Sequence, residues 1–122
     1  MSSESLRAKL TGMGVFEKDY LMRAIQQIAE AIAGIVGLVG DGKHEEALRE
    51  IADAQAKLAG PMGTGLDRLD ASSVIAILGT DKARLHAQLL RLESGARQAL
   101  GQSGKGSSVL ARAEAVERAL SA

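Results

Sequence analysis

The 122-residue chain has no cysteine, no tryptophan, one proline, one phenylalanine and one tyrosine. Without cysteine there can be no disulfide, no thiolate metal site and no thiol catalysis. With so few aromatics the core must come from Ala, Leu, Ile and Val, which suit closely packed helices better than a sheet. A chain of this length buries roughly two-thirds of its unfolded surface, enough for one domain with its own core.

Excess charge of one sign is also absent, since 15 basic residues balance 15 acidic ones. Up to Pro61 there are seven basic and nine acidic residues, and beyond it eight and six. Neither half therefore has the basic surface typical of nucleic-acid binding. The longest apolar run, residues 31–40, has ten residues, whereas a membrane-spanning helix needs about 20. No signal-peptide pattern opens the chain. The sequence predicts a cytoplasmic protein that binds neither nucleic acid nor membrane.

The clearest pattern in the chain is an amphipathic helix over residues 42–59, GKHEEALREIADAQAKLA. Ala47, Ile51, Ala54 and Leu58 recur at i, i+4, i+7 and i+11, which places them on one face of a helix. Alanine at two of these positions lets a neighbouring helix approach closely. The glycines before residue 43 predict a turn that joins this helix to a preceding one.

The rest of the chain predicts an all-α fold of two helical hairpins joined by a short helix. Residues 1–15 are expected to form a mobile leader and residues 16–122 a single helical domain. Within the domain we expect a hairpin over 16–60, a linker and short helix over 61–79, and a second hairpin over 80–122.

Several local signals mark the second half of this domain. Asp70 is a plausible N-cap and Gly79 a stop for the short helix, whose apolar run VIAIL has no partner strand to join. Thr80 is expected to cap the next helix. Residues 101–107, GQSGKGS, predict a flexible loop before the last helix.

An internal repeat relates the two predicted hairpins. Inner positions of the first hairpin recur 61 or 62 residues later as apolar or small residues, as in Ala47 and Val109, or Leu58 and Leu120. Gly34 matches Gly95 in this alignment. The alternative is that any two amphipathic helices can be aligned in this way. Gly34, Gly37 and Gly40 are predicted to be close-packing points or a frayed helix end.

Residues 28–61 have the length of one tetratricopeptide repeat, and with Gly42, Ala47, Ile51 and Ala54 they resemble one. The match departs at the large aromatic positions of that family, where this chain has Ala31 and Leu38. The resemblance implies a divergent or solitary repeat. Proteins of that family bind other proteins and do no chemistry.

A second resemblance begins at Phe16, where the chain reads FEKDYLMRAIQQ. It is similar to an uncharacterised family of small bacterial helical proteins that open F-x-K/R-D-Y and continue with a G-x-x-E-E-A-L helix. The resemblance covers residues 16–60 well and the remainder loosely. It implies a helical fold and carries no activity.

Candidate catalytic and metal-binding residues lack the partners that such chemistry needs. His44 and His86 have no second ligand at a metal-binding spacing and are expected to be solvated. Lys105 follows Gly104 as in a phosphate-binding loop, but Gly106 stands where Ser or Thr is required. No serine has a nearby base with an orienting acid. The sequence therefore predicts no enzyme, no catalytic residue, no metal and no cofactor.

The candidate interaction surface has an apolar part and a basic part. From residue 82 onward there are seven basic and three acidic residues, which could meet an acidic surface or simply be solvated. Near the start of the first helix the two aromatics could plug the core or anchor a partner. The surface comprises Phe16, Tyr20, Ile32, Val36, Arg84, Gln88 and Arg91.

The function predicted from these features is non-catalytic protein–protein interaction or self-association. One small helical bundle is not expected to bury all of the apolar side chains of Val36, Val39, Ile75 and Ile77. We expect a homodimer whose interface includes the first helix, with a protein partner of unknown identity as the other way to cover this surface. The alternative is a small-ligand or anion-binding regulatory domain that uses the basic C-terminal third.

Overall fold

The computed structural model describes the backbone of residues 3–122 and the side chains of residues 19–63 and 65–122. The chain is 90% helical, with five α-helices and no strand in the described part. The predicted all-α fold is confirmed. The elements are α1 (Ser3–Gly40), α2 (His44–Ala59), the 3₁₀-helix η1 (Gly60–Arg68), α3 (Ala71–Leu78), α4 (Thr80–Ala99) and α5 (Ser103–Ser121).

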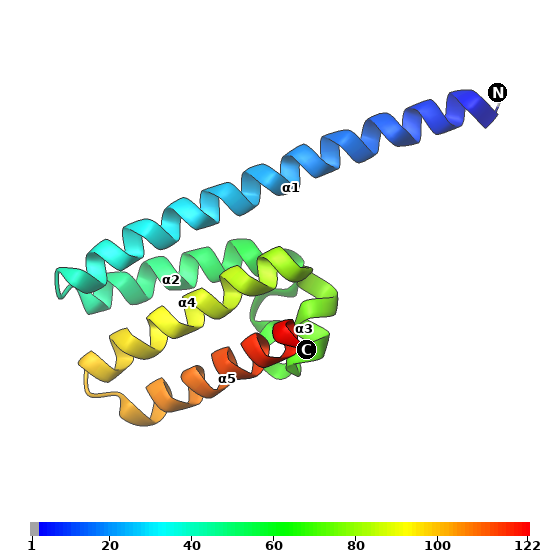
Figure 1. The fold of residues 1–122 in the computed structure, drawn as a ribbon. Coiled ribbons are helices and arrows are strands. Elements are labelled where there is room, and N and C mark those ends of the chain that lie inside the picture. Colours follow the sequence, from blue (N-terminus) through cyan, green and yellow to red (C-terminus); the bar gives the residue numbers. More distant parts are fainter. Residues whose placement is uncertain (1–2) are drawn as a thin grey trace.

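Helix α4 is at the centre of this arrangement, because it packs against α1, α2, α3 and α5. Helices α1 and α2 form the first antiparallel pair and α4 and α5 the second (Figure 1). Helix α1 is longer than the others and extends beyond them (Figure 1). It begins at Ser3, whereas the sequence predicts a helix start near Phe16. The side chains of residues 1–18 lie outside the described part, and the mobility of the leader stays a prediction.

The first hairpin closes through a tight turn at Gly42, whose φ of 77° suits glycine. The backbone N–H of Lys43 donates to the carbonyl of Leu38 at 2.9 Å, which satisfies the end of α1. The predicted inner face of α2 is confirmed in full. Its residues form one core with two residues from α1 and two from α4: Ala47, Ile51, Ala54, Leu58, Ile28, Ile35, Leu85 and Leu89.

The segment that the sequence predicts to be a linker between the hairpins begins with a 3₁₀-helix. Residues 60–68 form η1, with glycines at positive φ at Gly60 and Gly63. The Asp70 carboxylate then accepts a hydrogen bond from the Ser73 backbone N–H at 2.8 Å, so the predicted N-cap of α3 is confirmed. Gly79, at φ 82°, ends α3 as predicted and also takes the N-cap position of α4, so the cap predicted at Thr80 is wrong.

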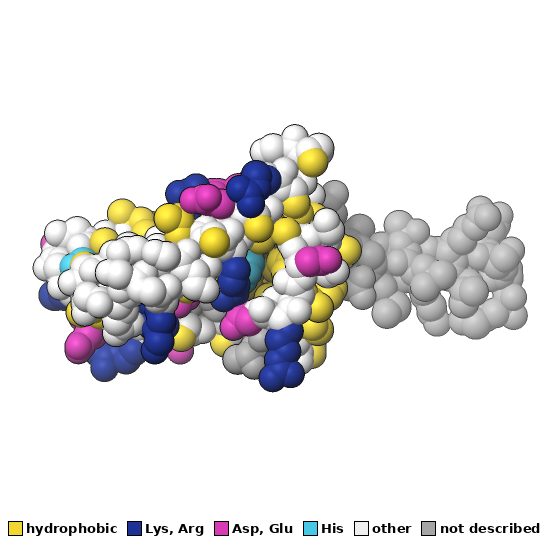
Figure 2. Space-filling model, turned by 90° about the horizontal axis from the view of Figure 1, so that it is seen from below, with side chains coloured by type: hydrophobic (Ala, Val, Ile, Leu, Met, Phe, Trp, Pro, Cys, Tyr) yellow, Lys and Arg dark blue, Asp and Glu magenta, His cyan; other side chains and the backbone are white. Residues whose placement is uncertain are grey.

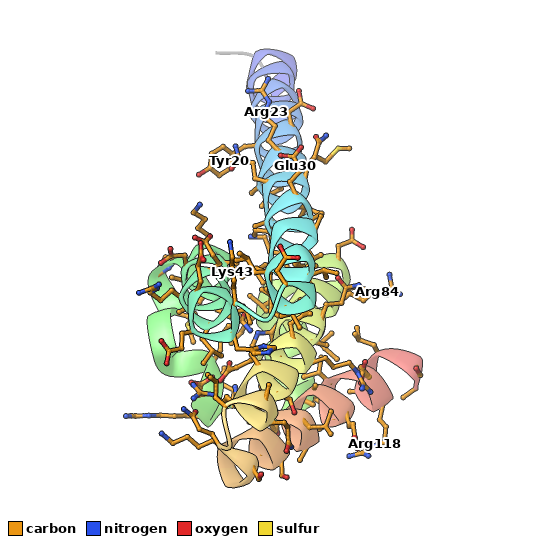
Figure 3. The ribbon with its side chains drawn as sticks, turned by 90° about the vertical axis from the view of Figure 1, so that its left-hand side faces the viewer. Tyr20, Arg23, Glu30, Lys43, Arg84 and Arg118 are labelled. Atoms are coloured by element: carbon orange, nitrogen blue, oxygen red, sulfur yellow. The ribbon has the colours of Figure 1, made fainter. Side chains whose placement is uncertain are left out.

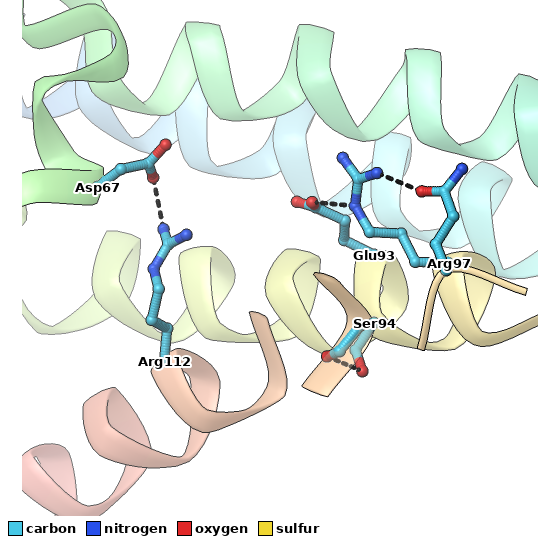
Figure 4. A network of polar contacts seen from close by, with 7 residues as sticks. Asp67, Glu93, Ser94, Arg97 and Arg112 are labelled. Atoms are coloured by element: carbon cyan, nitrogen blue, oxygen red, sulfur yellow. Dashed lines mark hydrogen bonds and ion pairs between the residues drawn. The ribbon is translucent and has the colours of Figure 1, made fainter. Parts of the chain in front are cut away.

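The predicted loop over residues 101–107 is also wrong, because α5 already begins at Ser103. Gly106 is buried there, and a Cβ at this position would lie 3.0 Å from Nε2 of Gln98. The Ser94 hydroxyl donates to the Gly106 carbonyl at 2.7 Å (Figure 4). At Gly106 helix α5 therefore lies close to side chains of α4, whereas Gly104 is in open space. A glycine-rich composition alone does not distinguish a close helix contact from a flexible loop.

The glycines predicted to be packing points are in open space. At Gly34, Gly37 and Gly40 an added Cβ would meet no atom within 4 Å. The prediction that these glycines are close-packing points within the fold is therefore wrong. Gly95, which the repeat pairs with Gly34, is also in open space. Gly34 and Gly37 remain exposed on α1.

Candidate functional site

One side of α1 is apolar and exposed to solvent. Met22, Ala29, Ala33 and Val36 lie at i, i+7, i+11 and i+14, so they share a helix face, and all four are exposed. We call these four residues the α1 outer face. Between residues 31 and 40 there is no polar side chain. Since α2 and α4 are the helices that pack on α1, its apolar circumference is wider than the surface they cover.

The predicted residues of α1 lie in different surroundings. Tyr20 is 74% exposed, and its ring projects from α1 away from the packed helices (Figure 3). It does not plug the core. Val36 is 53% exposed, as a contact residue should be. Ile32 is half-buried and packs against the core of the first hairpin. The side chain of Phe16 lies outside the described part.

The same segment of α1 is long and apolar enough to cross a membrane, by length and composition alone. Over residues 19–40 its most apolar window has a mean hydropathy of 1.3, and 11% of that window is buried in the fold. A core helix that is mostly buried passes the same criterion, and this helix is mostly exposed. The prediction that the chain binds no membrane stays a prediction.

Several arginines of the basic C-terminal third form ion pairs with acidic residues of the same chain. Arg84, Gln88 and Arg91 are all exposed on α4. The Arg91 guanidinium donates two hydrogen bonds of 2.7 Å to the Glu117 carboxylate, which raises the pKa of Arg91 and lowers that of Glu117. Arg84 lies 3.9 Å from the Asp81 carboxylate. The two sides of the predicted basic face are thus partly neutralised by acids of the same chain.

Two more arginines are paired, one near the turn between α4 and α5 and one where η1 faces α5 (Figure 4). Arg97 donates to Glu93 and to the Gln102 amide oxygen, each at 2.7 Å. Arg112 of α5 pairs with Asp67 of η1, which joins two elements 45 residues apart.

His86 is the main polar group that the sequence interpretation missed. Its side chain on α4 is 3% exposed, not solvated as predicted. Its Nδ1 lies 2.7 Å from Oε1 of Gln55 on α2, and Nε2 of Gln55 lies 3.5 Å from the His86 carbonyl. Because that carbonyl can only accept, the amide oxygen of Gln55 faces Nδ1, and Nδ1 carries the proton. The Nε2 lone pair has no hydrogen-bond partner among the described residues.

The imidazole of His86 is held neutral. Its pKa is lowered from 6.5 to about 4, first by burial and then by the charge of Arg112, while Asp67 opposes the shift. A neutral His86 is a hydrogen-bond acceptor at Nε2 and a poor proton donor near pH 7. This fits a structural or ligand-orienting role.

A cavity of about 290 Å³ opens beside His86, between α2, η1, α4 and α5. A second cavity of about 280 Å³ lies toward α3, and both are lined by Leu66, His86, Leu90 and Arg112. Seen from below, hydrophobic side chains gather at the end of the body near α3, and the surface is hollowed beside them (Figure 2). Small apolar cavities with a few convergent polar groups are the usual form of a ligand site.

A sequence signal for this burial exists on α4. Leu85, Ala87, Leu89 and Leu90 place position 86 in the middle of the apolar face of α4, opposite the exposed Arg84, Gln88 and Arg91. The apolar face of an amphipathic helix is the one that packs against the core. The other histidine, His44, has a buried Nδ1 without a hydrogen-bond partner in the described part. Among the described side chains no cluster of three His, Cys, Asp or Glu residues could hold a metal ion.

No protein-family model matches the chain, and no curated protein and no solved structure is similar to it.

Proposed function

We propose that the chain is a non-catalytic interaction module and that the α1 outer face is its contact surface. The observation that carries this proposal is the exposure of Met22 at 60% and Val36 at 53% on a helix with no polar side chain over its last ten residues. Exposed apolar surface of this continuity marks interaction sites in monomeric folds. The two-hairpin arrangement is compatible with a tetratricopeptide-like packing, which we propose for it.

The first partner to consider is a second copy of the chain. Two α1 helices can pair around a two-fold axis, and such isologous contacts are the commonest form of homo-oligomer. Gly37, one turn after Ala33 on the same side of α1, is in open space and would let the backbones of the two helices approach. The proposal is a homodimer through α1, with a protein of another kind as the other way to cover the same face.

Sedimentation equilibrium at tens of micromolar tests the proposal. We expect the wild type to be a dimer and Val36→Glu to be a folded monomer, since Val36 is exposed in the protomer. Gln27→Glu is the matched control, because Gln27 is exposed elsewhere on α1 and gains the same charge. A monomeric wild type would contradict the homodimer, and dissociation by both variants would contradict its assignment to the α1 outer face. Ile32→Glu is a poorer probe, because Ile32 packs against the core.

A membrane is the remaining way to cover α1. Flotation with phosphatidylcholine vesicles tests it, and we expect the wild type to stay with the unbound protein. Flotation that Val36→Glu abolishes would contradict a protein contact and reassign the outer face to lipid.

A second candidate function is small-ligand binding, favoured by the cavity beside His86. The sequence alternative placed such a ligand on the basic C-terminal third. Arg112 is the residue of that third that lines the cavity, and it is already paired with Asp67. A ligand there must therefore compete for one of these two charges.

A further inference from the structure

The exposed residues of α1 between positions 22 and 40 have the spacing of a coiled-coil seam. Six exposed positions are separated by four and three residues in turn, which gives the average period of 3.5 residues. They are Met22, Gln26, Ala29, Ala33, Val36 and Gly40. We call these six residues the α1 seam, and the α1 outer face is part of it. A surface with this period fits a second helix that runs along it.

Two charges of opposite sign flank the α1 seam on one side. Arg23 and Glu30 are exposed and lie on the side of α1 away from the packed helices (Figure 3). The four ion pairs among the described side chains belong to η1, α4 and α5, so neither residue takes part in one there. Within one helix the two residues are about 10 Å apart along the axis. Flanking charges of this kind set the orientation of paired helices.

The order of side chains along the α1 seam distinguishes two ways of pairing. In a parallel pair each residue faces its own copy, so Met22 meets Met22 and like charges lie at the same level. In an antiparallel pair with its two-fold axis beside residues 26–28, Met22 of one copy faces Ala33 of the other. Arg23 of each copy then lies within one turn of Glu30 of the other, and this contact occurs twice. The antiparallel arrangement therefore matches large with small side chains and positive with negative charge.

We propose that two copies of the chain pair through the α1 seam as an antiparallel coiled coil, held in register by two Arg23–Glu30 ion pairs between the copies. Gln26 then lies beside the axis opposite Ala29, a small residue that leaves room for its amide. Alanine at positions 29 and 33 lets the two backbones approach closely. The inference rests on the homodimer of the proposed function and adds its orientation and register.

Sedimentation equilibrium of the full-length protein tests the ion pairs by charge reversal. Arg23→Glu and Glu30→Arg each place like charges opposite one another twice and should raise the dissociation constant of the dimer about tenfold. The double variant exchanges the two charges, so its dissociation constant should return to within about threefold of the wild-type value. Arg49→Glu makes the same reversal at an exposed position of α2 and should leave the dissociation constant unchanged.

The double variant separates failure of the register from failure of the homodimer. In a parallel pair Arg23 and Glu30 of the two copies are about 10 Å apart along the axis, so the effects of the single variants would add. A dimeric wild type without rescue in the double variant would overturn the antiparallel register and leave the homodimer in place. A monomeric wild type would overturn the homodimer and this register with it.

Introduced cysteines give a second readout of orientation, because the chain has no cysteine of its own. In the antiparallel pair Met22 faces Ala33, while the two copies of Met22 are about 16 Å apart along the axis. Under mild oxidation a mixture of Met22→Cys and Ala33→Cys should therefore form a mixed disulfide, and Met22→Cys alone should stay unlinked. Efficient linking of Met22→Cys to its own copy would indicate a parallel pair and overturn the proposal.

Discussion

The two hairpins of this fold differ in the contacts between their helices and in the apolar surface that they leave exposed. In the second, α4 and α5 are joined by the Arg91–Glu117 ion pair, by the Ser94–Gly106 hydrogen bond and by a close crossing at Gly106. In the first, the described side chains of α1 pack against α2 and α4 through apolar contacts on one side, with Ile28 and Ile35 buried. Its other side leaves Met22 and Val36 in solvent. The difference is consistent with the proposal that α1 makes a further contact.

The largest expected effect concerns the joint between the hairpins, where His86 meets Gln55. The pKa of His86 is lowered from 6.5 to about 4 in the fold, so between these pH values the unfolded chain binds more protons. The free energy of unfolding should fall as pH drops from 6.5 to 4, by up to about 3 kcal/mol from this group. Urea unfolding at several pH values measures it. His86→Gln should flatten that part of the profile, and an unchanged profile would contradict a neutral buried imidazole.

The next effect tests the packed side of the first hairpin. Ala47 is fully buried between helices, so Ala47→Leu should overpack the core and cost roughly 1–3 kcal/mol. Arg49→Ala, an exposed change on the same helix, should cost under about 0.5 kcal/mol. Both are read from chemical denaturation. Equal costs would mean that α2 does not pack on α1 as described.

A smaller effect tests the polar contacts of the second hairpin. Ser94→Ala removes the buried hydroxyl that donates to Gly106 and should cost about 1 kcal/mol. Ser121→Ala removes a comparable bond to the Glu117 carbonyl in an exposed position and should cost less. If Ser121→Ala cost as much stability as Ser94→Ala, burial would not explain the contribution of the Ser94 hydrogen bond.

The smallest effect compares one glycine from each hairpin. Gly34→Ala places a methyl group in open space on α1 and should raise the free energy of unfolding by about 0.5–1 kcal/mol through helix propensity. Gly106→Ala should gain less, since its Cβ would crowd the Gln98 side chain at 3.0 Å. Thermal unfolding of dilute protein measures both. The same gain at both positions would show that α4 and α5 are not in close contact there.

The sequence predicts this fold best where periodicity and local turn chemistry agree. The inner face of α2, the Asp70 cap and the stop at Gly79 follow from residue spacing and from glycine's access to positive φ. The sequence is least informative where the same residue type can occur for two different structural reasons. Glycine at 106 permits a close helix crossing, whereas glycine at 34 faces open space.

The candidate sites follow the same division. Exposure of Val36 is predicted by the surplus of apolar residues on α1. Burial of His86 depends on four helices meeting around α4, which is a property of the tertiary structure. The pairing of Asp67 with Arg112 is likewise a long-range contact that no local pattern encodes.

The claim that the α1 outer face is covered in solution is tested most directly by comparing two methyl-bearing residues. Val36 on α1 is 53% exposed in the protomer and Ile77 on α3 is 49% exposed. A soluble paramagnetic chelate broadens NMR signals of methyl groups that it can approach. At tens of micromolar protein we expect the Val36 methyl signals to be protected and the Ile77 signals to be broadened. Equal broadening at the two residues would contradict a contact through α1.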